Sequence, residues 1–140
     1  MNITKALKLK KKLIKKAEAA YTRFSKYNSV DVNAETPYNA MDAYQEWIDL
    51  TNELIDLKTK IHLANAPVYD KIFRMSELKS LISQLKRVST ASGKVRTYGE
   101  EVVMTAAMTL VQCDELISQF EMEIDTLQDE LEAHNALTKI

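Results

Sequence analysis

The fold is decided by residues 3–24, which read ITKALKLKKKLIKKAEAAYTRF. Apolar side chains recur there every three or four residues, and lysines fill most of the positions between them. This spacing gathers the apolar side chains on one face of an α-helix and the charges on the other. We therefore predict a helix over about residues 3–24, followed by a polar loop from Ser25 to Pro37.

Two further stretches show the same helical period. Residues 39–64 predict a second helix, which ends at Asn65-Ala66-Pro67 because the residue before a proline disfavours helical geometry. A link over Val68 to Met75 is expected next, with Ser76 as the cap of a third helix. The apolar face of that helix contains Leu78, Leu81, Ile82, Leu85 and Val88.

The start of the last helix is predicted from an N-terminal capping motif. Thr109 and Gln112 have the spacing of a capping box, in which each side chain bonds an otherwise free backbone amide. The helix is expected to run to about Asn135. Its inward positions are Cys113, Leu116, Ile117, Phe120, Ile124, Leu127 and Leu131.

Between the third and fourth helices the period changes. Residues 94–108 contain β-branched side chains and a Tyr98-Gly99 break, so this segment is predicted to be extended or partly a β-hairpin. With 140 residues, two glycines and two prolines, the chain is predicted to be a single, mainly all-α domain over residues 1–140. We expect a long-helix bundle of about four helices with a short hairpin before the last.

Composition excludes several classes of protein. A formal net charge of −1 disfavours broad nucleic-acid binding, and one cysteine, Cys113, excludes a disulfide framework within the chain. Lys15 and Lys16 interrupt the only stretch that could resemble a signal peptide, and no apolar run is long enough to span a membrane. We expect a cytoplasmic protein with no membrane partner and no cofactor.

Charge is sorted along the chain, with seven lysines and no acid in residues 1–17 and eight acids and no base in residues 114–132. The first and last helices are therefore electrostatic complements, packed side by side in one subunit or meeting across a subunit boundary. Long helices also leave apolar area uncovered, with Trp47, Leu50, Leu57 and Met122 as candidates. A homo-oligomer is expected, with a closed ring as one arrangement.

Catalytic signals are weak. Glu46, Asp49, Glu53 and Asp56 share one ridge of the second helix, with Glu121 and Asp125 as acids from another helix. Carboxylates suit Mg²⁺, so a magnesium-dependent nucleotide pyrophosphatase is the enzyme alternative, although a solvated helix face has the same pattern.

The two histidines and the cysteine have simpler interpretations than catalysis. His62 and His134 are expected to be surface residues rather than ligands. Cys113 is expected to fill the core as a small apolar side chain.

A basic segment before the last helix is the favoured binding site. Arginine can form two parallel hydrogen bonds to a phosphate group, and serine hydroxyls can donate hydrogen bonds to the phosphate oxygens. A tyrosine ring can stack on a nucleotide base. The alternative is a solvated loop. The candidate ligand-binding residues are Lys86, Arg87, Ser89, Ser92, Lys94, Arg96 and Tyr98.

Short motifs resemble those of a family of bacterial and viral helical proteins of unknown function, some of which carry the toxin-like name septicolysin. They are Met1-Asn-Ile-Thr-Lys-Ala-Leu7, Ile61-His-Leu-Ala-Asn65, Glu101-Val102 and Asn135. Ala106 departs from the family pattern, which has a proline there. The resemblance implies an all-helical oligomer with a short β excursion and carries no activity to transfer.

These observations favour a non-catalytic, oligomeric helical binding protein. It would sequester a small anionic, nucleotide-type ligand at the basic segment, near subunit interfaces. A structural assembly protein, such as a virion or scaffold component, is the alternative outside the binding class. The complementary charges of the first and last helices support that alternative.

Overall fold

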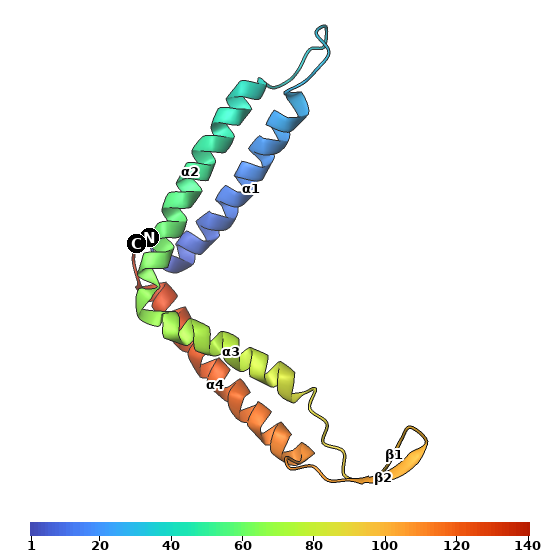
Figure 1. The fold of residues 1–140 in the computed structure, drawn as a ribbon. Coiled ribbons are helices and arrows are strands. Elements are labelled where there is room, and N and C mark those ends of the chain that lie inside the picture. Colours follow the sequence, from blue (N-terminus) through green and yellow to red (C-terminus); the bar gives the residue numbers. More distant parts are fainter. The chain divides into compact units, whose positions relative to one another are not determined.

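The computed structural model describes all residues from 1 to 140. Its mainly α architecture, with four helices and a β-hairpin before the last, confirms the predicted fold class (Figure 1). The chain divides into two compact units, Met1–Pro67 with Ala133–Ile140, and Val68–Glu132. The single domain stays a prediction. The elements are α1 (Ile3–Tyr27), α2 (Ala40–Ala64), the 3-10 turn η1 (Ala66–Val68), α3 (Tyr69–Leu85), β1 (Gly93–Thr97), β2 (Glu100–Met104) and α4 (Leu110–Leu137).

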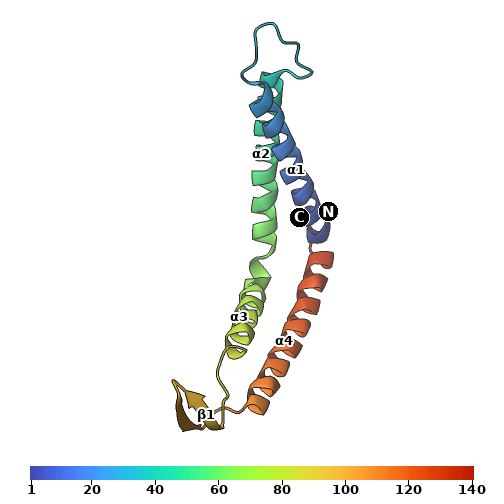
Figure 2. The ribbon, with the colours of Figure 1, turned by 90° about the vertical axis from the view of Figure 1, so that its right-hand side faces the viewer.

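In the first unit, α1 and α2 lie side by side and are joined by the loop over residues 28–39 (Figure 2). Asn2 caps α1 by accepting a hydrogen bond from the Lys5 amide, and Asn39 caps α2 in the same way. The buried cluster between the helices consists of Ala6, Leu13, Leu57 and Ile61. Alanines in the seam allow the two backbones to approach closely, since interaxial distance follows the size of the contacting side chains.

The two chain ends belong to this first unit and meet each other. The Ile3 amide donates to the Thr138 carbonyl at 3.1 Å, and the Ile140 amide donates to the Met1 carbonyl at 3.0 Å. Ile3 is fully buried there, and it is the largest side chain of the protein with no exposed surface.

In the second unit, α3 and α4 bury a narrow seam that includes Leu78, Ile82, Cys113, Leu127 and Leu131. The expected link over residues 68–75 and the cap at Ser76 are wrong, because α3 begins at Tyr69. Pro67 lies in η1, just before the helix, where its missing amide proton costs nothing. Leu81 and Val88 were expected on the buried face but are largely exposed.

The hairpin confirms the expected extended segment. Thr97 pairs with Glu100, so Tyr98 and Gly99 form a two-residue turn. Both have positive φ, 53° and 80°, as a type I′ turn requires. This turn type favours asparagine or glycine, so a tyrosine there is strained.

The capping box at the start of α4 is present as predicted. The Thr109 amide donates to Gln112 Oε1 at 2.9 Å, and the Gln112 amide donates to Thr109 Oγ1 at 3.2 Å. We expect Thr109→Ala to lower the free energy of unfolding by about 1 kcal/mol, because an amide of the first turn loses its acceptor. Urea denaturation followed by circular dichroism measures the change. Thr109→Ser keeps the hydroxyl and is expected to stay close to the parent, and an equal loss in both variants would contradict the cap.

None of the four helices combines the length and apolar content needed to cross a lipid bilayer.

Candidate functional site

The basic segment extends from the end of α3 into the hairpin. Lys86 is the C-terminal cap residue of α3. Arg87, Ser89 and Ser92 follow in the connection to β1, and Lys94 and Arg96 lie in β1. Tyr98 forms the turn. All seven side chains are exposed, with Tyr98 fully so.

Two glutamates of β2 balance the charge of the hairpin. Lys94 and Arg96 are two residues apart in β1, so they share one face of the hairpin. Arg96 lies directly opposite Glu101, and Lys94 Nζ is 3.6 Å from Glu101 Oε1. Glu100 lies next to Glu101 in β2, so the two strands carry two positive and two negative charges and no net charge. The sequence alone did not predict this charge balance. The positive character of the segment therefore depends mainly on Lys86 and Arg87.

Lys86 and Arg87 have no carboxylate partner in the structure. Arg87 Nη2 donates to Ser83 Oγ over 3.4 Å, a long and therefore weak hydrogen bond. Ser89 Oγ accepts from the Ala91 amide at 3.5 Å, which leaves its hydroxyl proton free to donate. Residues 86–92 thus contain two exposed cations and, besides the partly buried Thr90, two exposed hydroxyls, those of Ser89 and Ser92.

Two other cations of the second unit, Lys71 and Arg74, are paired. Lys71 Nζ lies 2.8 Å from Glu130 Oε2, and Arg74 Nε donates to Glu123 Oε1. The hydrogen bond from Lys71 to Glu130 raises the pKa of the lysine above its ordinary value, and Glu123 does the same for the pKa of Arg74. These pairs join α3 to α4 and have a structural role.

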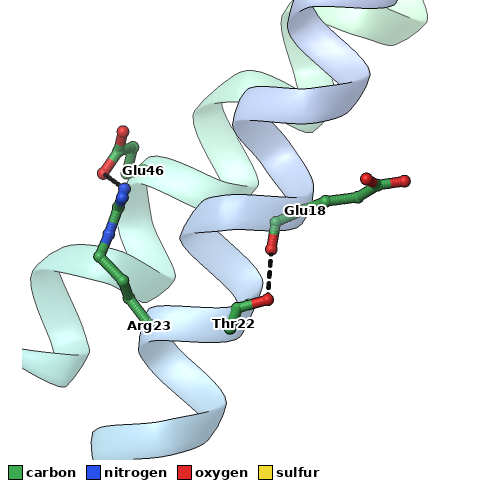
Figure 3. A network of polar contacts seen from close by, with 4 residues as sticks. All are labelled: Glu18, Thr22, Arg23 and Glu46. Atoms are coloured by element: carbon green, nitrogen blue, oxygen red, sulfur yellow. Dashed lines mark hydrogen bonds and ion pairs between the residues drawn. The ribbon is translucent and has the colours of Figure 1, made fainter.

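The acidic ridge of α2 does not form a metal centre. Glu46 Oε2 accepts from Arg23 Nη2 of α1 at 2.8 Å, beside the local Thr22–Glu18 hydrogen bond (Figure 3). Asp49 accepts from Gln45 Nε2 at 2.9 Å. Nowhere in the chain do three or more His, Cys, Asp or Glu side chains gather in a geometry that could hold a metal ion. The Mg²⁺ hypothesis for Glu46, Asp49, Glu53 and Asp56, with Glu121 and Asp125, is therefore not supported.

His134 corrects an expectation. It is partly buried rather than a plain surface residue: Nε2 donates to the Ala64 carbonyl at 3.1 Å, and Thr138 Oγ1 donates to Nδ1 at 3.1 Å. The ring thereby ties the end of α4 to the last residue of α2. Cys113 is 3% exposed, which confirms its place on the buried stripe.

An apolar groove runs along one side of the α1–α2 pair. It encloses about 340 Å³ and is lined by Ile14, Ala17, Glu18, Tyr21, Trp47 and Leu54. Ring contacts define its aromatic end, with the Tyr21 and Trp47 centroids 5.0 Å apart. Tyr21 is 48% exposed and Trp47 partly buried, whereas Leu57, expected to be exposed, belongs to the core. Sequence reasoning missed this cluster because its rings come from two helices.

The packing partner of α1 within its unit is α2, and the ion pairs of α4 are formed with α3. The eight lysines of α1 form no ion pair at all.

Comparisons with protein-family models, with curated proteins and with solved structures found no match for this chain. The resemblance to septicolysin-named proteins stays a prediction.

Proposed function

We propose that this protein is a non-catalytic, homo-oligomeric helical binding protein of the cytoplasm. Its ligand is a small anion of the nucleotide type, held by the basic segment of residues 86–98. The observation that carries the proposal is the group formed by Lys86, Arg87, Ser89 and Ser92. These cations and hydroxyls lie close together in the chain, and no carboxylate neutralises the cations.

Exposed area supports the oligomeric part of the proposal. Each unit buries one seam between two helices and leaves large apolar side chains uncovered, such as Ile55, Phe73 and Val111. Apolar surface on this scale normally becomes an interface.

Oligomerisation also supplies what an exposed segment lacks. A nucleotide-sized ligand is ordinarily held in a concave site that buries most of its surface. The basic segment of one copy is fully open, so segments from several copies would form the walls of such a site together. Sequestering such a ligand requires only that the protein binds it, without any catalytic group.

Isothermal titration calorimetry with a panel of nucleotides tests the proposal. We expect micromolar or tighter binding of at least one nucleotide, weakened about tenfold or more by Arg87→Ala, which removes a charged hydrogen bond to phosphate. Arg96→Ala is expected to weaken binding less, because Glu101 already lies opposite Arg96. Lys58→Ala, an exposed lysine of α2, is the matched control. No binding by any nucleotide, or equal affinity in the Arg87 variant, would remove the proposal.

A structural assembly protein is the second candidate, and one observation favours it. The hairpin is neutral overall, while apolar surface is abundant on both units. An oligomer in native mass spectrometry that carries no small molecule and binds no nucleotide would favour this alternative.

A further inference from the structure

The outer face of α1 carries an unpaired row of lysines. Lys5, Lys8, Lys12 and Lys16 are all exposed, and none forms an ion pair. At 100° per residue they fall within a stripe roughly 80° wide, on the side of α1 away from Leu13 and the α2 seam. We call these four residues the lysine ladder.

The outer face of α4 carries a matching row of acids. Glu121, Asp125, Asp129 and Glu132 are exposed and form no ion pair, although Glu132 accepts a hydrogen bond from Gln128 Nε2 at 3.1 Å. They also fall within a stripe roughly 80° wide, away from Leu127 and the α3 seam. We call these four residues the acidic ladder.

The two ladders have the same spacing when one is followed backwards. From Lys5 the steps are three, four and four residues, and from Glu132 towards the N-terminus they are also three, four and four. Antiparallel helices therefore bring four oppositely charged pairs into register over about 16 Å. The pairs are Lys5–Glu132, Lys8–Asp129, Lys12–Asp125 and Lys16–Glu121.

We propose that the lysine ladder of one copy docks antiparallel on the acidic ladder of a second copy. The inference rests on the homo-oligomer of the proposed function and names its interface. Complementary charge on matched spacing argues for a second copy, because the chain itself supplies both halves. In a two-fold dimer the contact would occur twice, since each copy offers one ladder of each sign.

Charge sets the register of this interface, and the four ion pairs together supply the attraction. Each exposed ion pair contributes little to the free energy of association, and salt screens the attraction between its charges. The apolar groove at Ile14, Tyr21 and Trp47 lies on the opposite side of α1, about 170° around the helix from the centre of the lysine ladder, and is not part of this contact. The association is therefore expected to weaken steeply with rising salt.

Charge reversal in trans is the decisive experiment. One variant carries Lys8→Glu, Lys12→Glu and Lys16→Glu, and the other carries Glu121→Lys, Asp125→Lys and Asp129→Lys. Each alone faces like charge at both ladder contacts, so its dissociation constant in sedimentation is expected to rise about tenfold or more. Mixed one to one, every ladder meets its opposite, and the mixture is expected to form heterodimers of near-parental affinity.

Controls separate this contact from a general charge effect. The control variant carries three Lys→Glu replacements at exposed lysines outside the ladder, namely Lys26, Lys58 and Lys60. It has the same net charge as the lysine-ladder variant and is expected to associate as the parent protein does. Circular dichroism verifies that all variants remain helical.

Each other outcome overturns the inference. If the parent protein associates and either ladder variant associates equally well, the ladders are not the interface, although the proposed oligomer stands. If both variants dissociate and the mixture does not recover, the ladders do not pair in trans. A parent protein that stays monomeric at every concentration removes the proposed oligomer together with this interface.

Discussion

Replacing Leu13 with alanine is expected to lower the free energy of unfolding by about 2–5 kcal/mol, the usual cost of truncating a buried leucine. Leu13 is 5% exposed and packs in the cluster with Ala6, Leu57 and Ile61. A two-helix seam has one layer of core side chains, so few neighbours can move in to fill the space that the leucine leaves.

Urea denaturation of the two proteins at equal concentration measures this difference, because association also stabilises the folded chain. Met122→Ala is the matched control: its side chain is 68% exposed, and the substitution is expected to change stability by less than about 0.5 kcal/mol. Equal midpoints for Leu13→Ala and the parent would mean that the α1–α2 seam is not the core of the first unit.

Ile3→Ala is expected to have the second large effect, again about 2–5 kcal/mol. Ile3 is the one large side chain with no exposed surface, and its own amide bonds the Thr138 carbonyl. Loss of the side chain opens a cavity where the two chain ends meet. Amide exchange at Ile3 and Ile140 should therefore accelerate more than exchange in the middle of α2, as seen by NMR.

Thr4→Ala is the appropriate control for that variant, because Thr4 is the exposed neighbour in the same helical turn. Its exchange rates are expected to match those of the parent. Acceleration spread evenly over α1 and α2 would contradict a local role for Ile3.

Local patterns predicted much of the fold. The apolar period over residues 3–24 predicted α1, although the helix continues to Tyr27, and the Thr109–Gln112 spacing predicted the start of α4. The start of α3 was missed because Val68 to Met75 was assigned to a link after Pro67, whereas a proline is compatible with the residues that lead directly into a helix.

The candidate site was harder to predict, because its features depend on long-range pairing. The neutralising position of Glu101 follows from strand register, which the sequence interpretation did not assign. The partners of His134 lie in α2 and beyond the end of α4, and no local pattern announces them. The ring groove likewise needs Tyr21 and Trp47 from different helices.

Asn2 and Lys139 pair in an isolated antiparallel bridge, which holds the two ends of the chain side by side in the first unit. A peptide link between the first and last residues would need only a short spacer, and the exposed stretch around Val32 offers a place to cut the ring. The order in which α1 to α4 follow one another is therefore not essential to the first unit, which depends on α1, α2 and the final residues being present together.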